Sequence, residues 1–91
     1  MQRYVIERDI PGAGSMSAAD QRAGAQASWG ALEQLGPRIQ WQESYVAGDR
    51  IFCVYLADNE TLIDEHSKLS GIPYTAIRKV DRVDDPLAAH G

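Results

Sequence analysis

Apolar and polar residues alternate along the chain in a pattern that predicts four strands and two helices. The strand-like stretches are rich in β-branched and aromatic residues, whereas the helix-like stretches repeat their apolar residues every three to four positions. The expected strands are RYVIERDI (3–10), RIQWQESYV (38–46), RIFCVYLA (50–57) and a shorter one within TAIRKVDRVDD (75–85). One helix is expected from Ala18 to Leu35 after an N-cap at Ser17, and a second from Asp58 or Asn59 to Gly71.

The resulting order of elements is β-α-β-β-α-β. The residues AGD (47–49) between the two central strands are typical of a β-hairpin. Right-handed crossovers and short connections favour a four-stranded antiparallel sheet with both helices on one face, which is the ferredoxin-like α+β fold. We expect one domain over residues 1–86 and a flexible tail over residues 87–91.

The hairpin also predicts which side chains share a face of the sheet. A turn centred on Gly48 and Asp49 sets three pairs opposite each other: Tyr45 with Phe52, Glu43 with Val54, and Trp41 with Leu56. Phe52, Val54 and Leu56 form the more apolar set of their strand. This set is therefore expected to face the helices, and Glu43 comes to that side with it.

The other face of the sheet is expected to be apolar as well. It would carry Ile51, Cys53 and Tyr55, with Val5, Val46 and Ser44 nearby. An apolar patch of this size is rarely left in water, and a second copy of the same sheet would cover it. The sequence therefore predicts a homodimer that joins through the open sheet face.

The first helix is expected to bury Ala25, Trp29 and Leu32, which recur at i, i+4 and i+7. Gly24 and Gly30 each cost roughly 1 kcal/mol relative to alanine inside a helix. We expect that cost to be offset by an unusually close approach of the helix to the sheet.

Composition argues against several classes of partner. The net charge is −4 and the nine Lys and Arg residues are scattered, so a nucleic acid is not an expected partner. No apolar run approaches the roughly 18 residues of a membrane span. The single cysteine, Cys53, cannot form a disulfide within the chain and is most often a small hydrophobe at such a position. A cytoplasmic protein is expected.

His66 interrupts the apolar stripe of the second helix, which Leu62, Ile63 and Leu69 define. A helical metal chelate would need a second ligand three or four positions away, where the chain has Leu62, Ile63, Leu69 and Ser70. A metal partner must therefore come from another element, with Glu43 the first candidate and Glu7 the second. Two other roles stay open for His66: a partly buried residue hydrogen-bonded to a carboxylate or carbonyl, and an acid/base group.

Three stretches together resemble a known family: YVIERDIPGAG (4–14), IQWQESYVAGDRIFCVYLAD (39–58) and IDEHSKLSGIP (63–73). The family consists of small bacterial proteins, formerly of unknown function and now labelled nickel-binding-protein-like, and the resemblance covers roughly residues 3–86. It implies a ferredoxin-like homodimer able to bind divalent nickel, with a role in sequestration or homeostasis. Imidazole and carboxylate groups suit Ni²⁺, and His66, Glu43 and Glu7 supply them.

Three functions are compatible with the sequence. The first is a dimeric protein that binds nickel or another divalent metal through His66, Glu43 and Glu7. The second is an enzyme of the dimeric α+β-barrel type, or a small-molecule-binding protein, that uses a pocket with His66 and Glu43. The third is a structural or regulatory module without a ligand. The residues leave catalysis open and favour a protein that is not an enzyme.

Overall fold

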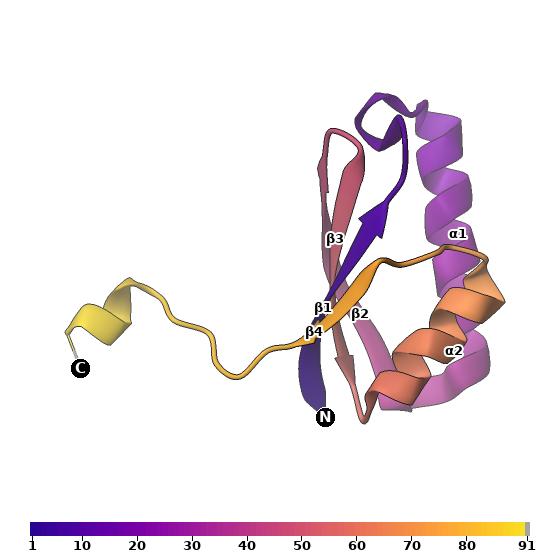
Figure 1. Ribbon diagram of the computed structural model, residues 1–91. Coiled ribbons are helices and arrows are strands. Elements are labelled where there is room, and N and C mark those ends of the chain that lie inside the picture. The colour runs from indigo at the N-terminus through magenta and orange to yellow at the C-terminus, as the bar shows by residue number, and fades with distance from the viewer. Residues whose placement is uncertain (91) are drawn as a thin grey trace.

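Four strands form one antiparallel sheet, and two helices cover one of its faces (Figure 1). The computed structural model describes residues 1–90. Its strands are β1 (Gln2–Asp9), β2 (Ile39–Ala47), β3 (Arg50–Ala57) and β4 (Ala76–Lys79), and its helices are α1 (Ala18–Leu35) and α2 (Glu60–Ser70). The strand order is β2-β3-β1-β4, so the predicted ferredoxin-like α+β arrangement is confirmed.

Local signals determine where both helices begin and end. The Ser17 hydroxyl accepts a hydrogen bond from the Asp20 backbone N–H at 3.1 Å, and the Asn59 side chain accepts one from the Leu62 N–H at 3.1 Å. Gly71 ends α2 with a φ of 73°, a left-handed conformation that favours glycine. The predicted bounds of α1 are confirmed, because these caps depend only on residues close in sequence.

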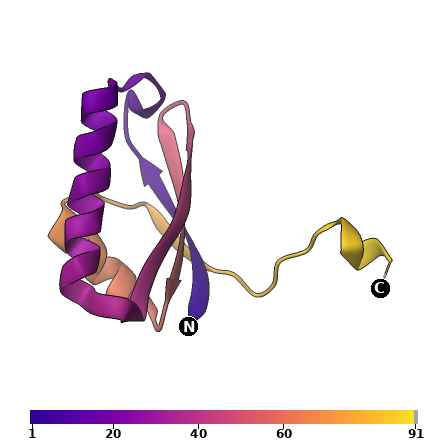
Figure 2. The same ribbon diagram turned by 180° about the vertical axis from the view of Figure 1, so that it is seen from behind.

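The last strand is shorter than the sequence pattern suggested. Only Ala76–Lys79 pairs with β1, and Val80 then donates a last backbone hydrogen bond to Arg3 at 2.9 Å. The charged segment 81–85 has no regular apolar spacing to hold it on the sheet. It projects away from the body and ends in the short 3₁₀ helix Pro86–Ala89 (Figures 1 and 2). Within residues 1–90, no helix combines the length and apolarity that a membrane span requires.

The β2–β3 hairpin confirms two of the three expected pairs, Tyr45 with Phe52 and Glu43 with Val54. The third expected pair is wrong. A bulge between Trp41 and Glu43 sets Trp41 opposite Tyr55 rather than Leu56. The extra residue places Trp41 and Ser44 on the same side of the sheet, three positions apart.

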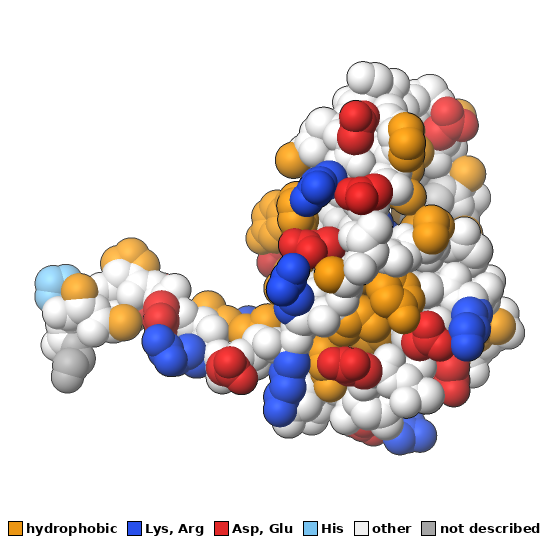
Figure 3. Space-filling view, viewed as in Figure 1, with side chains coloured by type: hydrophobic (Ala, Val, Ile, Leu, Met, Phe, Trp, Pro, Cys, Tyr) orange, Lys and Arg blue, Asp and Glu red, His pale blue; other side chains and the backbone are white. Residues whose placement is uncertain are grey.

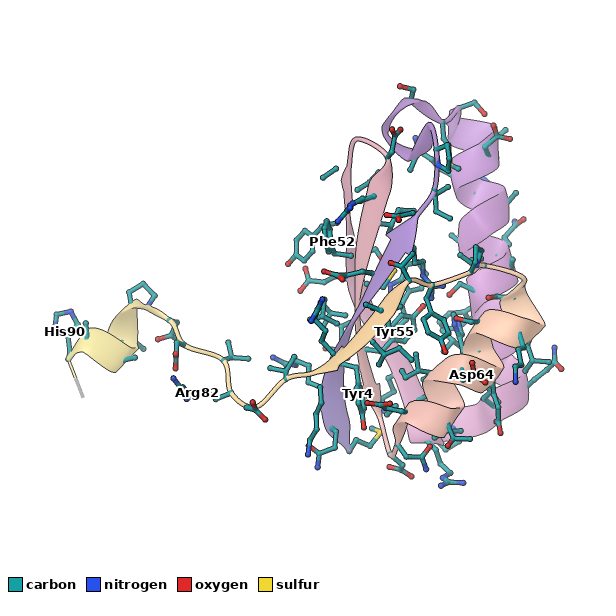
Figure 4. The ribbon with its side chains drawn as sticks, in the orientation of Figure 1. Tyr4, Phe52, Tyr55, Asp64, Arg82 and His90 are labelled. Carbon is teal, nitrogen blue, oxygen red and sulfur yellow. The ribbon has the colours of Figure 1, made fainter. Side chains whose placement is uncertain are left out.

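The two faces of the sheet are the reverse of those expected. Cys53 and Tyr55 are buried on the helix side, with 5% and 2% of their surface exposed. The half-buried Phe52, Val54 and Leu56 alternate with them and lie on the open face, and Figure 4 shows Phe52 and Tyr55 on opposite sides of the sheet. The sequence predicts the more apolar set on the helix side. The residues that lie there instead, Cys53 and Tyr55, carry a thiol and a hydroxyl group that are hydrogen-bonded in the interior.

Helix α1 packs on the sheet only through its C-terminal half. Its buried residues are Ser28, Ala31 and Leu32. The expected burial of Trp29 and Ala25 is wrong, since Trp29 is 60% exposed and Ala25 is exposed as well. The stripe that faces the sheet is rotated by one position from the predicted one.

The glycines of α1 do not mark a close approach to the sheet. A Cβ atom added at Gly24 or at Gly30 would meet no atom within 4 Å apart from the nearby backbone of its own helix. The expected compensation by tight packing is therefore wrong. Residues 18–27 are all exposed, so the N-terminal half of α1 stands away from the sheet and leaves a space beneath it.

Helix α2 buries Leu62, Ile63, His66 and Ser67. His66 continues the apolar stripe toward the sheet, as its spacing from Leu62 and Ile63 predicted. The expected third apolar member, Leu69, is 48% exposed. Ser67 takes the inward position because it contacts a buried charge from β1.

Candidate functional site

A cavity of about 520 Å³ lies between the N-terminal half of α1 and the helix side of the sheet. This volume is within the range of roughly 300–1,000 Å³ that is typical of small-molecule sites. Most of its wall is apolar and comes from Ile10, Ala13, Met16, Val46, Ile51, Ile72 and Pro73. Polar side chains from β1, β2, β3 and α1 complete the lining.

The loop after β1 closes one end of the cavity by packing on the β2–β3 turn. The Ile10 N–H donates to the Asp49 carbonyl and the Gly14 N–H to the Gly48 carbonyl, each at 2.8 Å. A Cβ atom at Gly14 would lie 3.1 Å from that Gly48 oxygen, so a side chain there would force the two loops apart. The glycine-rich sequence PGAG is thus explained by close packing of backbone on backbone.

Arg8 reaches the helix side because it is in phase with the buried Ile6 on β1. It is only 2% exposed. One terminal nitrogen, Nη1, donates to the Ser67 hydroxyl at 3.3 Å and to the carbonyls of Ile72 at 2.8 Å and Pro73 at 3.1 Å. Among residues 1–90 no carboxylate forms an ion pair with it, so a buried positive charge stands here without a counter-ion.

His66, Ser28 and Tyr55 form a buried hydrogen-bonded cluster. The Ser28 hydroxyl lies 3.0 Å from His66 Nε2 and 3.2 Å from the Tyr55 hydroxyl. The rings of Tyr55 and His66 pack against each other, with centroids 5.1 Å apart. Within residues 1–90, His66 Nδ1 is the one side-chain nitrogen or oxygen that is inaccessible to solvent and has no hydrogen-bond partner. If the imidazole proton were on Nδ1, a buried N–H would have no acceptor. We therefore assign the proton to Nε2, which donates to the Ser28 hydroxyl.

The charge state of this cluster follows from its burial. Burial lowers the pKa of His66 to about 4, and the nearby positive charge of Arg8 lowers it as well. Burial also raises the pKa of Tyr55. At neutral pH the imidazole and the phenol are both neutral, and Arg8 carries the positive charge of the site.

A second hydrogen-bonded chain runs along the hairpin. Trp41 Nε1 donates to the Ser44 hydroxyl at 3.0 Å, and Ser44 donates to the Cys53 sulfur at 3.1 Å. All three residues line the cavity. Cys53 is buried, as expected for a small hydrophobe, and it also holds Ser44 and Trp41 in fixed orientations.

The structure does not bring the predicted metal ligands together. His66 is buried on the helix side, whereas Glu43 and Glu7 lie on the open face with the sheet between. Glu7 pairs with Arg78 at 3.4 Å, and a hydrogen bond to Glu43 raises the pKa of Tyr45. Strand β3 separates the two glutamates, and they lie opposite residues two positions apart on it, Phe52 and Val54, which places their Cα atoms roughly 12 Å from each other.

Within residues 1–90 no group of three or more His, Cys, Asp or Glu residues is close enough to hold a metal ion.

Arg8, Ser28 and Tyr55 are the cavity residues that the sequence prediction missed. Arg8 could have been found from its phase with Ile6, because a charged residue at an inward position needs an explanation. Tyr55 was assigned to the wrong face with its whole strand. The helical spacing predicts burial of Trp29, the larger neighbour of Ser28, and so does not point to Ser28.

The fold and the cavity define a ferredoxin-like α+β protein with a ligand-sized space between its sheet and first helix. Residues 4–80 match the family described as nickel responsive protein SCO4226-like, and the chain belongs to this family. The family resemblance seen in the sequence is thereby confirmed. The crystal structure of SCO4226 from Streptomyces coelicolor A3(2) is similar, with a TM-score of 0.72 and 13% sequence identity over 90% of this chain and 99% of that chain. That likeness supports the fold alone, and no curated protein matches the sequence.

Proposed function

We propose that this protein binds a small organic molecule in the cavity between α1 and the sheet. The observation that carries the proposal is the cavity itself, about 520 Å³ in volume, with apolar walls and a few inward polar groups. Sites for small molecules commonly combine an apolar wall with a few fixed hydrogen-bonding groups. Arg8, Ser28 and Tyr55 are such groups here, and each is less than a tenth exposed.

The geometry favours binding over catalysis. An acid/base residue must reach its substrate directly or through one water. His66 is 1% exposed and is not part of the cavity lining, and its Nε2 is already bonded to Ser28. Its role is to hold Ser28 and Tyr55 in place.

Filling the cavity from α1 is expected to block ligand binding without unfolding the protein. Gly24 lies on the sheet-facing stripe with Ser28 and lines the cavity, and a side chain there meets no atom within 4 Å of its Cβ. We expect Gly24→Met to weaken binding of the neutral fluorescent probe N-phenylnaphthylamine about tenfold, or roughly 1.4 kcal/mol. The measurement is the rise in probe emission on titration.

Gly30→Met is the matched control, because Gly30 lies on the same helix but outside this cavity. Both substitutions replace a helical glycine by a good helix former, so both variants should be at least as stable as wild type. Equal probe affinity for the two variants would exclude the cavity as the binding site.

We further propose that the protein is a homodimer joined through the open sheet face. This face carries the half-buried Phe52, Val54 and Leu56, with Val5 beside them and Tyr45 55% exposed. Figure 3 shows hydrophobic side chains on the side of the sheet away from the helices, with charged side chains next to them. A second copy of the same sheet would cover this patch.

The C-terminal arm, residues 81–90, supports the same assembly. It leaves on the open-face side and projects away from the body (Figures 1 and 2). Val83 and Leu87 on the arm are 65% and 75% exposed. A partner subunit placed on the open face would give these apolar side chains a surface to pack on.

The family description favours a second function, the binding of Ni²⁺. Since residues 1–90 of one chain do not assemble three ligands, a nickel site would draw on both subunits. Glu7 and Glu43 share the open face, so a face-to-face dimer would gather two carboxylates from each copy at one interface. Divalent nickel accepts sites of mixed nitrogen and oxygen ligands, and these carboxylates would supply the oxygen ligands.

Calorimetric titration with Ni²⁺ tests this second function. We expect Glu43→Gln to weaken nickel binding by at least about tenfold. His66→Gln should leave it unchanged, because the imidazole is sealed on the opposite side of the sheet. If His66→Gln lost the heat of Ni²⁺ binding and Glu43→Gln kept it, the result would contradict a site on the open face and would identify His66 as a metal ligand.

A further inference from the structure

Arg8 is the one basic side chain among the described residues that line the cavity. A guanidinium group carries five N–H donors in a planar fork. The three hydrogen bonds of Arg8 within residues 1–90 all come from Nη1 and go to Ser67, Ile72 and Pro73. Nε and Nη2 carry the remaining N–H donors, and a hydrogen bond from Arg8 also lowers the pKa of Tyr55.

Those remaining donors of Arg8 are open to the cavity. If Nε or Nη2 were sealed without a partner, it would be a buried unsatisfied nitrogen, but in residues 1–90 His66 Nδ1 is the one such atom. Arg8 is 2% exposed overall and lines the cavity. The accessible edge of its fork is therefore small, and because Arg8 lines the cavity, a ligand there could reach this edge.

The Tyr55 hydroxyl supplies a second donor at the same place. When His66 donates to Ser28, the Ser28 hydroxyl can donate to the Tyr55 oxygen at 3.2 Å. The phenolic hydrogen of Tyr55 is then left to donate into the cavity that Tyr55 lines. The charge of Arg8 and a hydrogen bond from it both lower the pKa of Tyr55 against the stronger effect of burial.

We infer that the cavity binds an organic monocarboxylate, whose carboxylate pairs with the Arg8 guanidinium and accepts a hydrogen bond from Tyr55. This inference rests on the proposed ligand-binding function of the cavity and names the class of ligand. A carboxylate matches the guanidinium fork and would neutralise a buried charge that has no counter-ion among residues 1–90.

The rest of the lining limits the ligand to one negative charge and an apolar body. Arg8 offers a single positive charge, and Asp20 of α1 is the one acidic residue among the described lining residues, where it would repel further negative charge. Ile10, Met16, Ile51 and the other apolar side chains provide the wall for a hydrocarbon or aromatic portion. A dianionic phosphate fits less well, because it carries a second negative charge and has no apolar portion.

The test compares 4-phenylbutyrate with 4-phenylbutanol, which share an apolar body and differ in charge. Amide chemical shifts of the full-length protein are followed by NMR during titration with each compound and with inorganic phosphate. We expect 4-phenylbutyrate to bind at least about tenfold more tightly than 4-phenylbutanol, in keeping with a hydrogen bond to a charged group. The shifts should concentrate at residues that line the cavity, such as Cys53 and Tyr55.

Arg8→Gln should remove the preference for 4-phenylbutyrate, and Arg8→Lys should retain part of it. Arg50→Gln is the matched control, because Arg50 is an exposed arginine that pairs with Asp9 and does not line the cavity. The NMR spectrum itself reports whether each variant is folded. The wild-type comparison of the two compounds needs no variant, so the inference can be tested even if Arg8→Gln does not fold.

Equal wild-type affinities for 4-phenylbutyrate and 4-phenylbutanol would overturn the monocarboxylate inference and leave the proposed binding function standing. Wild-type affinity of folded Arg8→Gln for 4-phenylbutyrate would also overturn it. If inorganic phosphate competed with 4-phenylbutyrate at equal affinity, the inferred ligand class would be a phosphate rather than a carboxylate. Binding of neither compound, together with no response to N-phenylnaphthylamine, would overturn the inference and the proposed function together.

Discussion

Lowering the pH from 7 to about 4.5 is expected to destabilise the wild-type protein by roughly 2 to 3 kcal/mol more than it destabilises a His66→Gln variant. The cause is the buried, neutral imidazole of His66, whose pKa falls from 6.5 to about 4 on folding. Glutamine removes the titration and keeps a side chain that can hydrogen-bond to Ser28.

The direction follows from proton uptake by the two states. Between pH 6.5 and about pH 4, the unfolded chain binds a proton at His66 that the folded chain does not bind. The free energy of unfolding therefore decreases as the pH falls through this range. Well above pH 6.5 the imidazole is neutral in the folded and the unfolded state, so the contribution of His66 to the free energy of unfolding no longer changes with pH.

Urea unfolding at a series of pH values from 7 to 4.5 measures this effect. Carboxylates titrate in the same range, but they are common to both proteins and cancel when the two pH profiles are compared. His66→Gln should be less stable than wild type at pH 7 and should have the shallower profile. Parallel profiles for the two proteins would show that the pKa of His66 does not change on folding.

Val54→Asp is expected to convert the proposed homodimer into a folded monomer. Val54 is half-buried at the centre of the open face, on strand β3 and opposite Glu43. In a face-to-face dimer, a carboxylate at this position would be buried without a partner in both subunits. Breaking such an interface should raise the dimer dissociation constant at least about a hundredfold, or roughly 3 kcal/mol.

Sedimentation equilibrium measures the change in mass, and far-UV circular dichroism reports whether the variant keeps its fold. Leu69→Asp is the matched control, since Leu69 is an exposed apolar residue on α2, on the other side of the molecule. It should leave the association unchanged. A Val54→Asp protein that sediments as wild type would place the subunit contact elsewhere, or show that the wild-type protein is a monomer.

Most of the fold could be predicted because its signals are local. Ser17 and Asn59 cap the helices, Gly71 ends α2, and a short turn joins β2 to β3. Each signal acts over only a few residues. Once the order of elements is known, right-handed crossovers restrict the sheet to very few topologies.

The candidate site was harder to predict because it depends on which face of each element points inward. Phe52, Val54 and Leu56 are more apolar than Ile51, Cys53 and Tyr55, but the difference is small. If both faces of a sheet become covered, hydrophobicity alone does not distinguish them. The prediction that Glu43 lies on the same side of the sheet as His66 depended on which face was assigned to the helices.

The sequence by itself determined the element order, the helix ends, the hairpin register near its turn and the family. The tertiary structure alone decided that α1 stands away from the sheet over its first half, and that Arg8, Ser28 and Tyr55 meet in the resulting cavity. The physical reason is the range of the interactions involved. Caps and turns form between neighbouring residues, whereas the cavity depends on how far apart two packed layers come to rest, and that distance is set by contacts between residues far apart in the chain.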